Sequence, residues 1–177
     1  MAAIRLRSRP VTVTTAGDGP DQGGSGHAVE ESIIIDRPVE EVFGFLSVRG
    51  NDPVWMASVT ESEWLDPAEP MGVGRRGRMV MQAMGRREFL DEVTEYEPGR
   101  RIAHRSVAGP MVIHTACLTE PAGSGCRASI LYEPERLPGG VVGRLTTPLT
   151  ARIVRRTFRA DLARLKELLE AEAEVTR

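Results

Sequence analysis

The sequence has few cysteines, few aromatic residues and no long apolar run. Two cysteines among 177 residues do not make a disulfide scaffold. No apolar stretch approaches the roughly 20 residues that a membrane-spanning helix needs. The first residues, MAAIRLRSRP, are basic but lack the apolar core and the small-residue cleavage site of a secretory signal. These absences predict a soluble, cytoplasmic protein without a transmembrane segment.

The charges are nearly balanced. The chain has 23 basic and 25 acidic residues, for a net charge of −2 at pH 7. A general nucleic-acid-binding protein would show a basic excess, so no nucleic-acid partner is expected. The length fits one domain, which can bury a sizeable core.

The N-terminal segment differs from the rest of the chain. Residues 14–27 are rich in Gly, Asp and Pro and have almost no apolar side chain to bury. We therefore expect a flexible N-terminal arm over residues 1–27 and a folded domain over residues 28–173. A weak alternation within the first dozen residues leaves an added edge strand as the alternative.

The folded domain begins with one strand, two short helices and a series of further strands. Residues 29–36 are rich in β-branched side chains, and Pro38 introduces a helical pattern over residues 39–47. A second short helix is expected over residues 53–58. Strand patterns separated by Gly and Pro turns then predict an antiparallel sheet joined by hairpins, with strands over residues 59–65, 77–84, 88–96, 101–107, 111–119 and 126–133.

The C-terminal part of the chain is one long helical pattern from about residue 142 to residue 173. Its apolar side chains lie on one narrow stripe, and four arginines lie on the opposite side. Such a one-sided helix needs a concave partner, which a curved antiparallel sheet supplies. The stripe comprises Thr147, Ala151, Val154, Phe158, Leu162, Leu165 and Leu169, and the arginines are Arg152, Arg155, Arg156 and Arg159.

This order of elements resembles the SRPBCC superfamily, which is START-like and birch-pollen-allergen-like, and within it the bacterial polyketide cyclase/dehydrase-like group. The similarity rests on four motifs: ESIIIDRPVEEVFGFLS at 31–47, EVTEYEPGRRIAHRS at 92–106, EPAGSGCRASILYEPE at 120–135 and RIVRRTFRADLARLKELLE at 152–170. The resemblance implies an α+β helix-grip fold, with a seven-stranded curved sheet wrapped around the long C-terminal helix. It also implies an apolar cavity between the two that holds lipids, polyketides or sterols.

Alternation along the strands and the helix stripe indicates which side chains line this cavity. Trp55 is expected at its mouth, and methionines suit ligands of irregular shape. The expected wall comprises Trp55, Met79, Met81, Ile102, His104, Ile113, Thr115, Cys117, Ile130, Tyr132, Ala151, Val154 and Phe158.

The register of the hairpin around Gly109 decides where the histidines point. If the loop comprises residues 108–110, His104 and His114 lie opposite each other on one face. If it is Gly109-Pro110 alone, His104 faces Thr115 and His114 points away. The second register gives one apolar inner set with His104 and Tyr132 as its polar members, so we favour it. His104 and Tyr132 are then candidates for a catalytic base and a proton donor.

The remaining motifs are interpreted as structural features and not as functional sites. Gly72, Gly74 and Gly77 have the spacing of a dinucleotide loop, but a strand pattern follows, so they are expected to shape a turn. Arg75 and the other paired arginines are interpreted as solvated surface. Asp91 is interpreted as part of a solvent-facing acidic strand. Two histidines without a third ligand predict no metal site, and no cofactor is expected.

Cys117 and Cys126 are expected to be free, buried thiols. They would be diagonal neighbours if Thr119 pairs with Cys126 across the hairpin turn.

Three functions are compatible with these patterns. The first is binding or transport of a hydrophobic small molecule in the cavity, and it is favoured because few polar groups are expected inside. The second is a polyketide aromatase/cyclase-like enzyme. The third is a non-catalytic partner of a larger enzyme, in which the arginine face of the last helix meets an acidic protein or an anionic membrane surface. No pattern predicts the oligomeric state.

Overall fold

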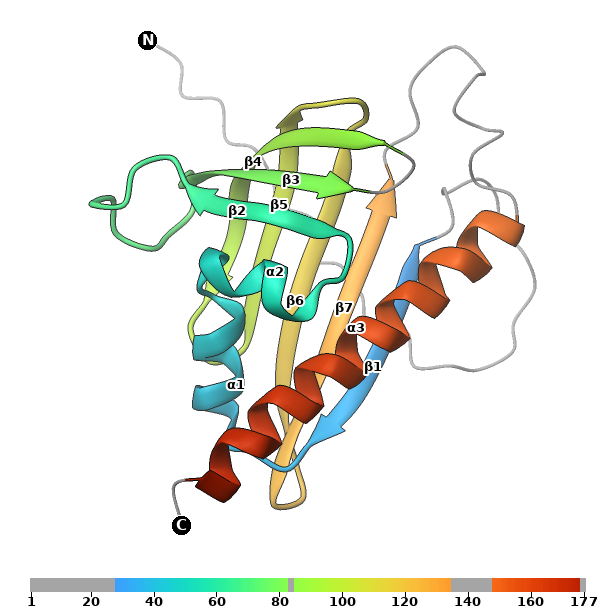
Figure 1. The fold of residues 1–177 in the computed structure, drawn as a ribbon. Helices are drawn as coiled ribbons and strands as arrows, with labels where there is room; N and C mark the ends of the chain where they lie inside the picture. Colours follow the sequence, from blue (N-terminus) through green and yellow to red (C-terminus); the bar gives the residue numbers. More distant parts are fainter. Residues whose placement is uncertain (1–27, 83–84, 135–147, 176–177) are drawn as a thin grey trace, which may run out of the picture.

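The computed structural model describes residues 28–82, 85–134 and 148–175. Within them, one seven-stranded sheet is combined with two short α-helices, a 3₁₀ turn and one long C-terminal helix (Figure 1). The order is β1 (Val29–Ile35), α1 (Val39–Leu46), η1 (Arg49–Asn51), α2 (Asp52–Trp55), β2 (Val59–Trp64), β3 (Arg76–Gln82), β4 (Arg86–Glu97), β5 (Arg101–Ala108), β6 (Ile113–Ala122), β7 (Gly125–Pro134) and α3 (Pro148–Val175).

The predicted helix-grip fold is confirmed. All neighbouring strands are antiparallel, in the order β1-β7-β6-β5-β4-β3-β2, and the curved sheet holds α3 against its concave side (Figure 1). Register shifts between β2 and β3 and between β4 and β5 mark irregular points of the ladder, which increase local twist. The predicted arm at 1–27 and the predicted first turns of the long helix at 142–147 lie outside the described residues.

The β5–β6 hairpin has the favoured register. His104 pairs with Thr115 and Ile102 with Cys117. Gly109 has a φ of +141°, and a Cβ there would lie 2.8 Å from the Phe89 ring. Only glycine combines this backbone conformation with this close approach to β4, which helps to fix where the hairpin turns.

The β6–β7 hairpin differs from the assumed pairing. Thr119 pairs with Ala128 and Cys117 with Ile130, because the turn contains only residues 123 and 124. Cys126 therefore faces Pro121 and is not diagonal to Cys117. Both thiols are free, as predicted.

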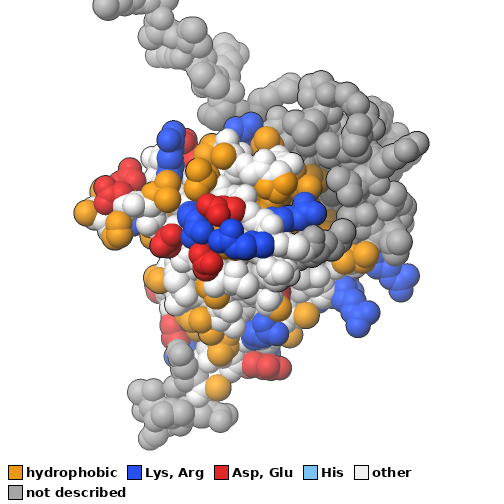
Figure 2. Space-filling view, turned by 45° about the horizontal axis from the view of Figure 1, so that its top comes forward, with side chains coloured by type: hydrophobic (Ala, Val, Ile, Leu, Met, Phe, Trp, Pro, Cys, Tyr) orange, Lys and Arg blue, Asp and Glu red, His pale blue; other side chains and the backbone are white. Residues whose placement is uncertain are grey.

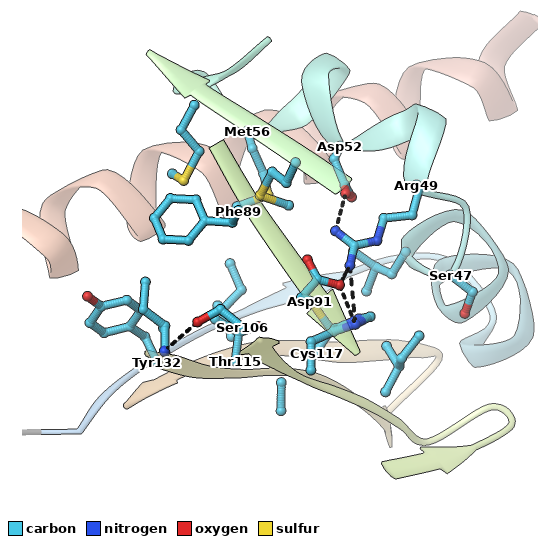
Figure 3. A pocket seen from close by; sticks show the side chains of 18 of the residues that line it. Ser47, Arg49, Asp52, Met56, Phe89, Asp91, Ser106, Thr115, Cys117 and Tyr132 are labelled. Atoms are coloured by element: carbon cyan, nitrogen blue, oxygen red, sulfur yellow. Dashed lines mark hydrogen bonds and ion pairs between the residues drawn. The ribbon is translucent and has the colours of Figure 1, made fainter. Parts of the chain in front are cut away.

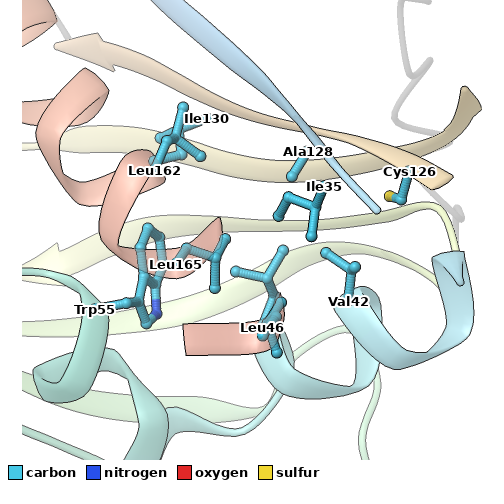
Figure 4. Close-up of a cluster of buried hydrophobic side chains, with 10 residues drawn as sticks. Ile35, Val42, Leu46, Trp55, Cys126, Ala128, Ile130, Leu162 and Leu165 are labelled. Atoms are coloured by element: carbon cyan, nitrogen blue, oxygen red, sulfur yellow. The ribbon is translucent and has the colours of Figure 1, made fainter. Parts of the chain in front are cut away.

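Helix α3 is anchored by apolar contacts at its C-terminal half. Leu162, Leu165 and Leu169 are buried, and they join a cluster that includes Ile35, Trp55 and side chains of α1 and β7 (Figure 4). The stripe predicted from the sequence therefore faces the core in this half of the helix.

Polar contacts tie the same helix to β1. Arg159 Nε donates to Glu31 at 2.7 Å, and Lys166 Nζ donates to the Ile34 carbonyl at 2.8 Å. The Asp36 amide donates to Glu170 at 2.7 Å. The four arginines of the opposite side are exposed, and Val154 and Phe158 are half-buried. These bonds fix the helix along the edge strand.

The outer face of β2–β4 is charged (Figure 2). Arg78 donates to Glu88 at 2.9 Å, to Glu61 at 2.8 Å and to Glu63 at 3.2 Å. Exposed pairs of this kind contribute little stability individually, but charge discourages pairing of the β2 edge with another strand.

Replacing Leu165 by alanine is expected to destabilise the fold by about 3–5 kcal/mol, because the side chain is fully buried between helix and sheet. Ile153→Ala, on the same helix at 58% exposure, is the matched control and should stay within about 0.5 kcal/mol of the native chain. Chemical denaturation measures both. Equal losses at the two positions would contradict the placement of the helix.

Candidate functional site

A cavity of about 160 Å³ lies between the sheet, α2 and α3. Side chains of α1, η1, α2, α3 and strands β2–β7 form its wall (Figure 3). Most of the wall is apolar, with Leu46, Trp55, Met56, Trp64, Met79, Met81, Phe89, Ile102, Ile113, Ala116, Cys117, Ile130 and Phe158. The polar members are Ser47, Arg49, Asp52, Asp91, His104, Ser106, Thr115 and Tyr132.

The structure brings together all but two of the side chains expected on this wall. Ala151 and Val154 are absent from it, and both are half-buried. They lie about two turns and one turn N-terminal to Phe158. Toward the N-terminus of α3, the cavity wall therefore ends at Phe158. The residues that do line the cavity are Trp55, Met79, Met81, Ile102, His104, Ile113, Thr115, Cys117, Ile130, Tyr132 and Phe158.

A buried arginine occupies one end of the cavity. Arg49, whose side chain is 5% exposed, extends from η1 and donates through Nη2 to Asp91 Oδ1 on β4 (Figure 3). Its Nη1 lies 3.9 Å from Asp52 Oδ2. A buried charge is stable only when it is paired, so these three groups depend on one another.

The sheet is adapted to hold this guanidinium. A Cβ at Gly77 would lie 2.9 Å from Arg49 Nη2, so glycine leaves the space that the arginine fills. Trp64 has the guanidinium carbons of Arg49 and Arg75 at 4.9 and 4.5 Å from its ring centroid, within cation–π range. Gly77 therefore lies in strand β3 and not in the predicted turn, and Arg75 is buried and not solvated.

His104 lies beside this pair. Its Nδ1 is 3.4 Å from Arg49 Nη2 and 3.6 Å from Asp91 Oδ1. Burial, with the Arg49 charge as a second cause, lowers the pKa of His104 to about 3. The ring is therefore neutral near pH 7, and it is a weak proton acceptor.

Asp52 has a pKa that burial shifts toward neutral pH. Burial raises its pKa to about 6, against the opposing effects of Arg49 and of the Ser62 hydroxyl, which donates to Oδ2 at 2.6 Å. Burial also raises the pKa of Asp91, which Arg49 opposes. Asp52 thus changes its charge between pH 5 and 7.

A second polar group lies on β5–β7. Tyr132 pairs with Thr115, its ring meets Phe158 edge-on at 6.0 Å, and burial raises its pKa. Ser106 accepts from the Ile113 amide at 2.8 Å and donates to the Met111 carbonyl at 3.0 Å, so its hydroxyl is used by the hairpin. Because its pKa is raised, the Tyr132 phenol on the cavity wall stays protonated at neutral pH.

Cys117 has little nucleophilic character. Burial is the main cause that raises the pKa of its thiol to about 12. The thiolate, which is the reactive form, is therefore scarce at neutral pH.

The sequence interpretation missed the charged end of the cavity. Asp91 was placed on a solvent face, but it is buried, and so are its alternate neighbours Phe89 and Val93. This apolar–acidic–apolar alternation could have indicated an inward carboxylate. Arg49 and Asp52 gave no such signal, since Arg49 lies in the three-residue turn η1 and Asp52 begins the four-residue helix α2, and both elements are too short to show periodicity. Arg49 was not among the side chains expected on the wall.

Neither metal clusters nor membrane-spanning helices are found in the described part of the chain. There, no three His, Cys, Asp or Glu side chains are placed to hold a metal ion. No helix in those same residues is long and apolar enough to cross a membrane.

Replacing Arg49 by methionine is expected to cost about 3–5 kcal/mol at pH 7.5, because Asp52 and Asp91 are left as buried carboxylates without a cation. Without Arg49 the folded-state pKa of each carboxyl rises further above its unfolded value. The loss should therefore shrink as the pH falls toward 5 and the carboxyls bind protons.

Arg76→Met is the control, since that arginine is 63% exposed and pairs with Glu92 at the surface. Its effect should be at most about 1 kcal/mol. Urea denaturation at pH 5 and pH 7.5 compares the two variants. A pH-independent loss for Arg49→Met would contradict the buried cluster.

Comparisons with solved structures find the same fold. TTHA0849 from Thermus thermophilus aligns with a TM-score of 0.67 and 23% identity over 82% of this chain and 99% of that one. The protein Ara h 8.0201 aligns with a TM-score of 0.61 and 11% identity over 82% of this chain and 98% of that one. The di-domain ARO/CYC BexL of the BE-7585A biosynthetic pathway aligns with a TM-score of 0.60 and 21% identity over 81% and 46%.

No curated protein sequence matches the chain. Residues 26–170, however, match the family described as polyketide cyclase/dehydrase and lipid transport. The curved sheet, the long helix and the cavity between them are those of the SRPBCC superfamily. The chain belongs to the polyketide cyclase/dehydrase and lipid transport family.

Proposed function

We propose that this protein binds a small, largely apolar molecule in the cavity between the sheet and α3. The observation that carries the proposal is the wall itself: apolar and aromatic side chains surround most of the space, and buried polar groups gather at one end. Ligand sites typically have this composition, in which a few polar groups orient a mostly apolar ligand.

The volume limits the size of the ligand. A cavity of roughly 150 Å³ accepts a benzene-sized molecule, and the cavity here measures about 160 Å³. It therefore suits a single ring, a short alkyl chain, or one segment of a longer lipid or polyketide. Met56, Met79 and Met81 lie on the wall, and their flexible side chains can adapt to different shapes.

A second candidate function is a polyketide cyclase-like reaction. It is supported by the structural similarity to the di-domain ARO/CYC BexL and by polar groups on the wall. His104, the base predicted from the sequence, has a pKa of about 3, so Asp52 at about 6 is the better proton acceptor. Tyr132 would be the proton donor.

A poly-β-ketone thioester mimic tests this reaction. Chromatography with mass detection should show a cyclised or dehydrated product that Asp52→Asn no longer forms. The enzyme candidate is rejected if native protein and a protein-free blank give the same products.

The third prediction from the sequence concerns partners. Arg152, Arg155 and Arg156 are exposed on α3, which is compatible with an acidic partner or an anionic membrane surface. Such a partner, the cytoplasmic location and the lack of a nucleic-acid partner remain predictions.

Fluorescence tests the binding function directly, because both tryptophans of the chain, Trp55 and Trp64, line the cavity. Bromobenzene, a heavy-atom quencher of suitable size, should quench their emission along a saturable curve. Free N-acetyltryptophanamide, the control, should show only a linear collisional effect. Linear quenching of the protein as well would contradict the proposal.

Phe158→Ala should destabilise the fold less than Leu165→Ala, because Phe158 borders space that is partly unfilled whereas Leu165 is fully packed. Affinity for bromobenzene should change several-fold in Phe158→Ala and stay within twofold in Leu165→Ala. Denaturation and quenching measure the two effects. A loss below about 1 kcal/mol with unaltered binding would contradict the position of Phe158 in the helix-grip fold.

A further inference from the structure

The charged end of the cavity contains more carboxylates than cations. Asp52 and Asp91 line it from α2 and β4, while Arg49 is the only basic side chain with a charge near pH 7 among the wall residues described. His104 is also there, but its ring is neutral. One carboxylate is therefore left without a full counter-charge.

Geometry shows which carboxylate this is. Arg49 Nη2 donates a hydrogen bond to Asp91, whereas its Nη1 approaches Asp52 only to 3.9 Å and makes no hydrogen bond there. The two contacts of Asp52, with Arg49 and with Ser62, both use Oδ2. Oδ1 of this carboxyl remains able to accept a hydrogen bond from a ligand.

The other groups around Asp52 do not supply the missing charge. Ser62 on β2 is neutral, and Cys117 on β6 keeps its proton. Arg75, which precedes β3, donates to the Asp66 carbonyl, and Asp161 on α3 accepts from the Ala57 amide. The charges that act on Asp52 are those of Arg49 and Asp91, and these two oppose each other.

We propose that the cavity selects ligands whose polar end is a protonated amine, and that the Asp52 carboxylate binds this amine. The proposal rests on the proposed function, since it requires that the cavity holds a small apolar molecule. With a volume of about 160 Å³, the matching chemistry is a single ring or short chain that carries one ammonium group.

The physical reason is desolvation. A carboxylate removed from water favours a cation or a strong hydrogen-bond donor beside it, and a ligand ammonium supplies both. A neutral hydroxyl supplies only the hydrogen bond. A ligand carboxylate adds a second negative charge next to Asp52 and Asp91, which disfavours its binding.

Three probes with one ring and a short chain separate these cases: 2-phenylethylamine, 2-phenylethanol and 3-phenylpropionate. Calorimetric titration at pH 7.5 should give at least tenfold tighter binding of the amine than of the alcohol, with the carboxylate weakest. Toluene serves as the apolar reference for cavity binding itself.

The pH dependence identifies the carboxylate. The amine stays protonated between pH 5 and 7.5, while Asp52, with a pKa of about 6, loses its charge as the pH falls. Binding of the amine should therefore weaken about tenfold at pH 5, and binding of the alcohol should change less than twofold.

Two variants assign the effect to Asp52. Asp52→Asn should remove the preference for the amine and its pH dependence. Ser62→Ala removes the hydrogen bond that lowers the Asp52 pKa. This variant should still prefer the amine at pH 8, and the midpoint of the pH dependence of amine binding should move to a higher pH. Circular dichroism and thermal melting check that both variants are folded.

The outcomes are distinct. If none of the four probes binds the native protein, the proposed function fails. If toluene or the alcohol binds and the amine is not preferred, the cavity function stands and the amine proposal is overturned. A preference that persists in folded Asp52→Asn also overturns it, and the native selectivity series decides the matter if that variant does not fold.

Discussion

The pairing of a buried arginine with a buried carboxylate is the interaction on which the cavity depends. Arg49 and Asp91 come from η1 and β4, so their contact joins the irregular connection after α1 to the middle of the sheet. Gly77 leaves room for the guanidinium, and Trp64 packs within cation–π distance of it. The charged end of the cavity is therefore fixed before any ligand is present, as a preorganised site requires.

The opposite side of the cavity is held by apolar packing. Leu162, Leu165 and Leu169 fix the C-terminal half of α3, and Phe158 lies one turn before them, where the wall of the cavity begins. The C-terminal half of α3 is thus packed against the core, whereas Phe158 borders the cavity. The packed C-terminal half stabilises the fold, and the space beside Phe158 is where we propose that the ligand binds.

Much of the fold could be predicted from the sequence because its signals are local and periodic. β-Branched strands, Gly and Pro turns and the apolar stripe of the last helix each indicated one element. The alternation of Ile102 and His104 even favoured the correct hairpin register. The charged end was different. Arg49 and Asp52 lie in η1 and α2, which are too short to show periodicity, and their partner Asp91 resembles a surface acid beside Glu92. Only tertiary pairing reveals that these groups are buried together.

Methyl NMR of selectively labelled methionines is the sharpest test of whether the cavity binds a small apolar molecule. Met56, Met79 and Met81 line the cavity, whereas Met71 packs outside it against the cluster of Phe43, Val93 and Ile102. On titration with toluene, we expect saturable shifts of the first three methyl signals and little change at Met71. Unchanged cavity signals at saturating toluene, or shifts of equal size at Met71, would contradict it.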